Sequence, residues 1–247
     1  MFPGIAEEFN GNRLYKYYSY NDDDRKMFAP ILDRTLRYKR MDTFNDPYDC
    51  YIGRRENGEI LPYDPGLSMY YVCSMTTSCD NFLMWSHYAS NHKGFVVEYD
   101  AKKLKGIERP QIETFSKVSY SDEIYIKDFI SSDDQKIVKS IYHKASCWSY
   151  EDEIRSVIYD GTENPEYRVV ELDESYVTGI FLGSQFLKGR HGKIPMFLQE
   201  WHKNNKLYYM QLQFDKYKLE KMIVKDTNVK WCCPCDFHCG DALDRIL

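Results

Sequence analysis

Two glutamates separated by a single residue give the strongest chemical signal in this sequence. They lie in the stretch Trp148-Ser149-Tyr150-Glu151-Asp152-Glu153-Ile154-Arg155. Because side chains alternate along a strand, an extended backbone would place Glu151 and Glu153 on the same face. Two carboxylates in one site can divide the work between orienting a nucleophile and stabilising a developing cation. The structural alternative is a solvated strand entry in which Arg155 pairs with either acid.

A second signal is a run of hydroxyl side chains at the end of an apolar stretch. Residues 69–74 read as a buried strand, and Ser74-Met75-Thr76-Thr77-Ser78 follows. Hydroxyls at a strand end can orient a carboxylate or bind a sugar hydroxyl, although serine and threonine are also common helix caps. The next segment contains Trp85, His87 and Tyr88, and a lone histidine on a helix is more often structural than catalytic.

These residues need an α+β scaffold to position them. The pattern predicts many short, mostly antiparallel strands that form a split or bent sheet flanked by helices. Residues 53–66 read as a polar surface excursion before a buried strand, and Ser78 or Asp80 as the cap of a short helix. We expect strands near residues 14–18, 36–41, 69–74, 95–99, 117–120, 153–159, 167–172, 177–182, 207–214 and 219–224, and helices near 22–34, 82–89, 131–145 and 194–204. No linker divides the chain, so a single domain over residues 1–247 is expected.

Composition narrows the class of protein. Hydrophobic residues make up 43% and charged residues 29% of the 247 residues, as in ordinary globular proteins. The net charge is −5, and the only local basic run is residues 37–40, so nucleic acid is not the leading partner and stays open only as an acceptor. The start of the sequence lacks an export signal, and no stretch is apolar enough for a membrane helix. A cytoplasmic protein without a membrane partner is expected.

Eight cysteines are present, and without an export signal we expect reduced thiols. Cys232, Cys233, Cys235 and Cys239 lie close to His238, and the pair Cys232 and Cys235 has the spacing of half a zinc site. A second pair with this spacing is missing from the sequence. The expectation is therefore no metal, with a zinc-supported hydrolase as the third functional alternative.

Four separated blocks resemble the bacterial family known as domain of unknown function 2971. They are Leu14-Tyr15-Lys16-Tyr17, Phe44-Asn45-Asp46-Pro47-Tyr48-Asp49, Met84-Trp85-Ser86-His87-Tyr88-Ala89 followed by Lys93-Gly94-Phe95, and Trp148-x-Tyr150-Glu151-x-Glu153-x-Arg155. The blocks span most of the chain in the order of the family. The resemblance implies one domain of this type over residues 1–247, and it leaves the biochemical activity open.

The order of the blocks is also similar to the layout of ADP-ribosyltransferases. By this similarity Lys16 or Tyr17 takes the position on the first strand, although a histidine or arginine is usual there. Ser74 and Thr76 take the hydroxyl position, and Glu151 with Glu153 form the Glu-x-Glu pair. The similarity implies an ADP-ribosyltransferase-like fold.

The activity implied by this layout is ADP-ribosyl transfer from NAD, or NAD hydrolysis, in a bacterial toxin or phage-defence effector. Glu153 would hold the ribose 2′-hydroxyl and favour an oxocarbenium-like ribose, and Glu151 would orient or deprotonate an unidentified macromolecular acceptor. The alternative is a non-catalytic interaction module of a defence or mobile-element system, in which Glu151, Glu153 and Arg155 form structural ion pairs. The residues expected to bind NAD are Tyr15, Lys16, Tyr17, Ser74, Thr76, Trp85, His87 and Tyr88.

Overall fold

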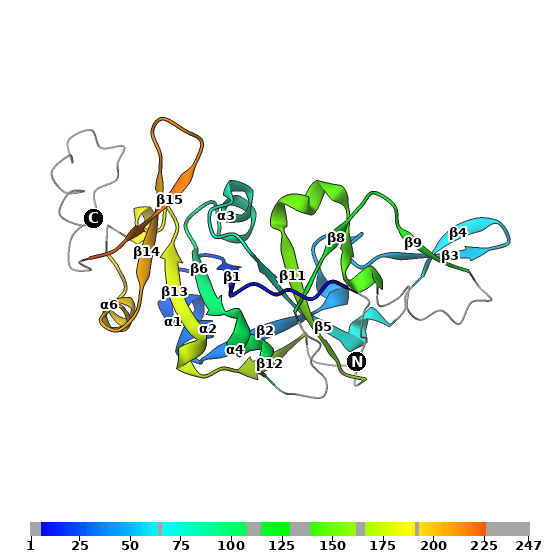
Figure 1. Ribbon diagram of the computed structural model, residues 1–247, viewed down its shortest axis with the longest axis horizontal. Helices are drawn as coiled ribbons and strands as arrows, with labels where there is room; N and C mark the ends of the chain where they lie inside the picture. The colour runs from blue at the N-terminus through cyan, green and yellow to red at the C-terminus, as the bar shows by residue number, and fades with distance from the viewer. Residues whose placement is uncertain are drawn as a thin grey trace. The chain divides into compact units, whose positions relative to one another are not determined.

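The computed structural model describes residues 6–63, 66–107, 115–128, 139–161, 166–190 and 193–225 (Figure 1). The chain divides into two compact units, each assembled from segments that are distant in the sequence. Unit 1 comprises Met1–Asn12, Thr35–Thr77 and Lys102–Leu172, and unit 2 comprises Arg13–Arg34, Ser78–Ala101 and Asp173–Leu247. The α+β class is confirmed, because mixed sheets with few, short helices make up the described residues. The expectation of a single domain stays a prediction.

Unit 1 is built on an antiparallel sheet. Its strands follow the order β12 (Tyr167–Glu171), β2 (Thr35–Arg40), β5 (Tyr70–Thr76), β11 (Glu153–Tyr159) and β7 (Ser116–Lys117). A smaller sheet contains β4 (Glu59–Tyr63), β3 (Ile52–Glu56) and β9 (Tyr125–Asp128), and β10 (His143–Lys144) pairs with β8 (Ser119–Tyr120). Three 3-10 turns, η1 (Met41–Thr43), η2 (Leu67–Met69) and η3 (Ser146–Glu151), connect these strands.

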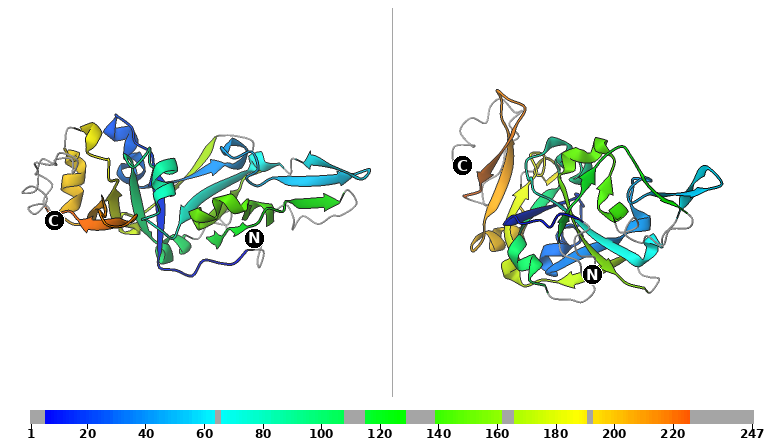
Figure 2. Two further views of the ribbon diagram at one scale, coloured as in Figure 1. Left: turned by 90° about the horizontal axis from the view of Figure 1, so that it is seen from above. Right: turned by 45° about the vertical axis from the view of Figure 1, so that its right-hand side comes forward.

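The polar surface excursion expected over residues 53–66 coincides with a hairpin of β3 and β4, and neither strand is among those expected from the sequence. Asn57 and Gly58 connect the two strands with φ angles of 51° and 87°. Positive φ at both central residues is required by the two-residue turn of type I′, and Asn-Gly is the sequence that meets this requirement most readily. Figures 1 and 2 show the hairpin extending away from β2, β5 and β11.

Unit 2 contains a second run of five paired strands. The order is β1 (Arg13–Tyr18), β6 (Phe95–Asp100), β13 (Val177–Leu182), β14 (Leu207–Leu212) and β15 (Leu219–Ile223), and only β13 and β14 run parallel. The helices of this unit are α1 (Asp24–Met27), α2 (Ala29–Leu32), α3 (Phe82–Tyr88) and α6 (Met196–His202), with η4 (Glu174–Tyr176) and η5 (Lys188–Arg190); α4 (Ala101–Lys105) begins at its boundary. Phe28, between α1 and α2, packs on Phe197 of α6 with ring centroids 4.6 Å apart, and Figure 1 shows these helices beside β13 and β14. Among the described residues no helix has the length and apolar character needed to cross a membrane.

Three helix predictions need correction. The helix expected over residues 22–34 is two helices of four residues each, because Pro30 lacks the N–H that a continuous helix requires. The cap of α3 is Asn81, whose Oδ1 accepts from the N–H groups of Leu83 and Met84 at 2.9 and 3.2 Å, rather than Ser78 or Asp80. Residues 131–138 of the helix expected over residues 131–145 lie outside the described residues. The predicted end of this helix is wrong, because His143 and Lys144 form strand β10.

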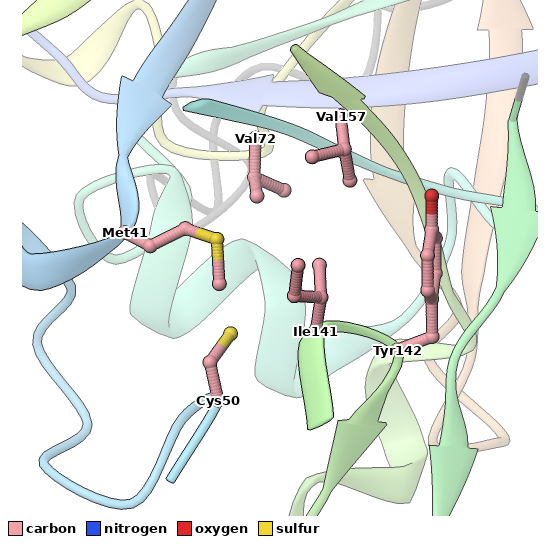
Figure 3. Close-up of a cluster of buried hydrophobic side chains, with 6 residues drawn as sticks. All are labelled: Met41, Cys50, Val72, Ile141, Tyr142 and Val157. Atoms are coloured by element: carbon pink, nitrogen blue, oxygen red, sulfur yellow. The ribbon is translucent and has the colours of Figure 1, made fainter. Parts of the chain in front are cut away.

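An apolar cluster lies on one face of the unit 1 sheet (Figure 3). Val72 of β5 and Val157 of β11 are opposite each other in the paired strands, so both point to this face. Ile141, which has no exposed area, packs with them. The remaining members are Met41, Cys50 and Tyr142, and Phe44 and Tyr70 pack against the cluster. Ser74 and Thr76 follow Val72 at alternate positions of β5, so the same face changes from apolar to polar toward the end of the strand.

Candidate functional site

Five ionisable side chains of unit 1 meet in the interior and form what we call the charged cluster. Its members are Asp49, Lys144, Glu151, Glu153 and Arg155, none of which has more than 8% of its surface exposed. Asp49 ends a turn-rich loop before β3, Lys144 lies on β10, Glu151 ends η3, and the other two lie on β11. Three carboxyl groups therefore face two basic side chains inside the unit.

Arg155 is the centre of the cluster and has no exposed area. Its Nε and Nη2 donate to the two oxygens of Glu153 at 2.7 and 2.9 Å, and Nη2 also donates to Asp49 Oδ2 at 2.8 Å. Nη1 donates to the carbonyl oxygen of Ile141 at 2.7 Å and to the sulfur of Cys50 at 3.3 Å. All five guanidinium donors thus have acceptors, which is what a completely buried arginine requires.

Lys144 is the second cation of the cluster, and it contacts all three carboxylates. Its Nζ lies 2.6 Å from Glu151 Oε2 and 3.5 Å from both Asp49 Oδ2 and Glu153 Oε2. The ammonium also lies 4.9 Å from the centroid of the Trp148 ring, within the range of a cation–π interaction. Glu151 and Glu153 therefore share one site, as predicted, with an ammonium between them.

The predicted reason for this proximity is wrong for Glu151. The residue lies in the 3-10 turn η3 rather than in an extended strand, and Asp152 adopts a left-handed conformation with φ of 43° before β11 begins. The left-handed residue reverses the local direction of the chain, so the period-two rule does not apply across it. The Asp152 side chain bonds to the Thr77 hydroxyl, which supports this turn.

The hydroxyl block lies beside Glu153, as the sequence predicts. Thr76 is directly opposite Glu153 in the paired strands β5 and β11, and Ser74 is opposite Arg155. The Ser74 hydroxyl hydrogen-bonds the Glu153 carboxylate. The backbone N–H of Glu153 donates to the Tyr120 hydroxyl at 2.8 Å. The carboxylate of Glu153 is thus held in one orientation from both strands.

Burial and ion pairing act on Glu153 in opposite directions. Burial raises the pKa of the carboxyl, but Arg155, Lys144 and the Ser74 hydroxyl outweigh it and hold the pKa at about 2. Burial also lowers the pKa of the two cations, and again the carboxylates reverse the effect, so the pKa of Lys144 and of Arg155 is raised. Glu153 is therefore ionised at neutral pH although it is buried.

This shift makes the free energy of unfolding depend on pH in acid. Because the pKa of Glu153 falls from 4.5 to about 2 on folding, its contribution is complete above pH 4.5 and is lost as the pH falls toward 2. For this one group the slope is at most about 1.4 kcal/mol per pH unit. Urea unfolding at pH 7, 4.5 and 3 should show a smaller acid loss in Glu153→Gln than in the wild type. Equal losses in the two proteins would contradict the assignment.

The residues predicted on β1 belong to unit 2. Tyr15 donates its hydroxyl to Glu98 Oε2 at 2.9 Å, and Arg13 and Thr178 bond to the same carboxylate. Tyr17 donates to the carbonyl oxygen of Ser78 at 3.1 Å. Lys16 lies on the alternate face of the strand and is half-buried.

The residues predicted on α3 also belong to unit 2. Trp85 has no exposed area, packs edge-on against Tyr17 and donates its Nε1 to the carbonyl oxygen of Cys79 at 2.8 Å. His87 is exposed, and its ring meets the half-buried Tyr88 edge-on. The roles of the β1 and α3 residues in binding NAD stay predictions.

Two members of the charged cluster, Lys144 and Asp49, carry no functional signal in the sequence. Lys144 is an isolated lysine in a segment predicted to be helical, and no local pattern marks it. Asp49 was visible only as the last residue of the block Phe44–Asp49, where it read as a turn former. The Phe44 ring of that block lies 5.7 Å from the Arg155 guanidinium carbon. The contact brings the second and fourth family blocks together at one place.

The described residues contain no group of three or more His, Cys, Asp or Glu side chains placed to hold a metal ion. Cys50, Cys73, Cys79 and Cys147 are free thiols. The cysteines at 232, 233, 235 and 239, on which the zinc alternative rests, lie outside the described residues.

Comparisons with known proteins give a family and no activity. Residues 84–156 match the model of a family described as a protein of unknown function (DUF2971), which confirms the family predicted from the sequence. All members of the charged cluster except Asp49 lie in that segment. Calbindin of Gallus gallus is 29% identical over 115 residues, which are 43% of this chain and 42% of calbindin, so the chain spans less than half of that relative. No solved structure matches the chain.

Proposed function

We propose an activity for this protein, whose family is described as one of unknown function. It cleaves the bond between nicotinamide and ribose in NAD and transfers ADP-ribose to an acceptor or to water. One observation carries the proposal. Glu153 is an ionised, buried carboxylate whose orientation is fixed from two paired strands, and the hydroxyl-bearing end of β5 lies directly opposite it. In the layout of ADP-ribosyltransferases that the sequence resembles, Ser74 and Thr76 take the hydroxyl position and Glu153 takes the catalytic position.

The chemistry suits such a carboxylate. When the glycosidic bond breaks, nicotinamide leaves with the bonding electron pair and positive charge develops on the ribose. A preorganised negative charge stabilises that cation without reorganisation during the reaction. Arg155 and Lys144 keep Glu153 ionised, so its negative charge is present when the ribose cation develops. A nucleophile then bonds to the ribose carbon and loses its proton.

Glu151 acts on the acceptor rather than on the ribose. Its carboxylate is bound to Lys144, and the residue lies at the end of η3, two positions before β11 begins. We assign it the orientation or deprotonation of the acceptor nucleophile, as in the Glu-x-Glu pair of the transferases. The acceptor is a macromolecule, and the setting that fits such an activity is a bacterial toxin or a phage-defence effector in the cytoplasm.

The first test is nicotinamide release from NAD by the full chain, with Ser74→Ala and Ser156→Ala as a matched pair. Each change removes one hydroxyl near β11, but only Ser74 bonds to Glu153, whereas Ser156 accepts from the Tyr38 hydroxyl at 3.2 Å. Losing one hydrogen bond to a charged group costs about 1.5 kcal/mol, so Ser74→Ala should slow release about tenfold. Ser156→Ala should change the rate by less than about twofold.

Absence of NAD cleavage, together with absence of NAD binding at millimolar concentration, would reject the proposal. Equal rates of nicotinamide release by the two serine variants would reject the role of Glu153. NAD would then be cleaved at another site of the protein. Both outcomes can be read from one set of purified proteins whose folding is checked by circular dichroism.

A second candidate function has its own supporting observation. Arg155 is completely buried, and every one of its donors has an acceptor inside unit 1. Such a network can serve stability alone, in a non-catalytic module that binds proteins of a defence or mobile-element system. In that case the wild type neither binds nor cleaves NAD, and substitutions in the cluster change only the free energy of unfolding.

A further inference from the structure

Among the described residues, strand β12 has a partner strand along only one of its two edges. It pairs with β2 on one side, and no described strand pairs with it on the other. The N–H of Arg40 donates to the carbonyl oxygen of Glu166 at 3.0 Å, directly before β12. Because backbone groups alternate in an antiparallel pair, those of Arg168 and Val170 also point to β2. The outward N–H and C=O groups belong to Tyr167, Val169 and Glu171.

This edge lacks the proline and the lysine that occur on the edge strands β4 and β15. Strand β4 contains Pro62, which cannot donate to an added strand, and β15 exposes the charged pair Glu220 and Lys221. Strand β12 contains neither proline nor lysine, and the side chains of Tyr167 and Val169 on its open face are 40% and 43% exposed. Residues of these types favour strand pairing.

The charges on the same face complement those of a second copy. The Arg37 guanidinium lies over the Tyr167 ring, 4.2 Å from its centroid, and Lys39 is opposite Tyr167 in β2. Glu171 lies at the other end of β12, is exposed, and has no ion-pair partner in the part of the chain that the structure describes. An antiparallel second copy of β12 would place its Glu171 next to Tyr167 and the cations.

We propose that β12 is a self-association edge, at which two copies of the chain pair antiparallel with Val169 opposite the partner's Val169. In this register Tyr167 is opposite the partner's Glu171, and the reciprocal pair forms by symmetry. The outward backbone groups of all three residues then exchange hydrogen bonds with their partners. An interface of one short strand from each copy belongs to the small, weak class, below about 1,200 Å².

The test is sedimentation of the full chain from about 1 µM to 1 mM, a range suited to weak association. Val169→Pro removes the outward N–H while the bonds to β2 remain, and Val169→Thr keeps both the shape and the N–H. The proline variant should weaken dimerisation at least tenfold, and the threonine variant should behave as the wild type. A wild type that is monomeric throughout, or a dimer unaffected by Val169→Pro, would overturn the proposal.

A charge exchange tests the register without a backbone change. Arg37→Glu and Glu171→Arg should each weaken the dimer about tenfold, because each places like charges across the interface. The double variant Arg37→Glu with Glu171→Arg should regain most of the affinity. All these side chains are exposed, so the monomer should keep its melting temperature. Failure of the double variant to regain affinity would overturn the proposed register.

Discussion

Replacing Arg155 by alanine is expected to lower the free energy of unfolding by about 3–5 kcal/mol, a large share of the stability of a typical domain. The change leaves Glu153 and Asp49 buried with only Lys144 to balance them, and it leaves the carbonyl oxygen of Ile141 without its donor. Burying carboxylates that have lost their partner is far more costly than losing a pair at the surface. Urea unfolding followed by circular dichroism measures the effect.

The matched control for Arg155→Ala is Arg25→Ala. Arg25 also forms an ion pair, with Asp33, but its side chain is 61% exposed. Water replaces the lost contact at such a site, so the free energy of unfolding should fall far less in Arg25→Ala than in Arg155→Ala. Similar losses in the two variants would mean that burial does not determine the contribution of Arg155.

Glu153→Gln is expected to reduce NAD cleavage about a hundredfold or more per folded molecule. Glutamine keeps the shape of the side chain and loses the charge that would stabilise the developing ribose cation, which is worth about 3 kcal/mol in the transition state. The same change removes a partner of Arg155 and Lys144, so the variant is also less stable. Nicotinamide release must therefore be measured at low temperature and divided by the folded fraction.

Asp49→Asn separates the two effects of Glu153→Gln. Asp49 is buried and bonded to the same two cations, so the loss of its charge should destabilise the fold to a similar degree. It does not lie opposite the hydroxyls of β5, and its variant should keep cleavage within about tenfold of the wild type. Equal loss of activity in both variants would show that the cluster acts on folding alone.

Most strands could be predicted from the sequence because their side chains carry a local signal. Runs of valine, isoleucine and aromatic residues gave β5, β6 and β11 within two residues of their observed ends. The hairpin of β3 and β4 was missed although Asn57-Gly58 marks its turn, because the polar composition of the segment outweighed that dipeptide. Pro30 was likewise a readable signal for the break between α1 and α2.

The candidate site was only partly predictable for a different reason. Glu151, Glu153 and Arg155 lie within five consecutive residues, so their proximity is a local property of the chain. Asp49 is 106 residues away from Arg155, and its contact depends on the pairing of strands that bring distant segments together. The left-handed conformation of Asp152 carries no strong signal in the sequence, since only glycine adopts it freely.

Cys50 is a buried thiol in contact with the charged cluster, and its reaction with a labelling reagent can report on that cluster. Its thiol donates to Asp49 Oδ1 and accepts from Arg155 Nη1, each at 3.3 Å, and only 1% of the residue is exposed. Burial and the neighbouring carboxylate raise the pKa of this thiol well above its ordinary value, so the reactive thiolate is scarce in the native state. An alkylating reagent can reach the sulfur only after the ion pairs around it have separated. The rate at which Cys50 is labelled therefore measures how often the interior of unit 1 opens to solvent.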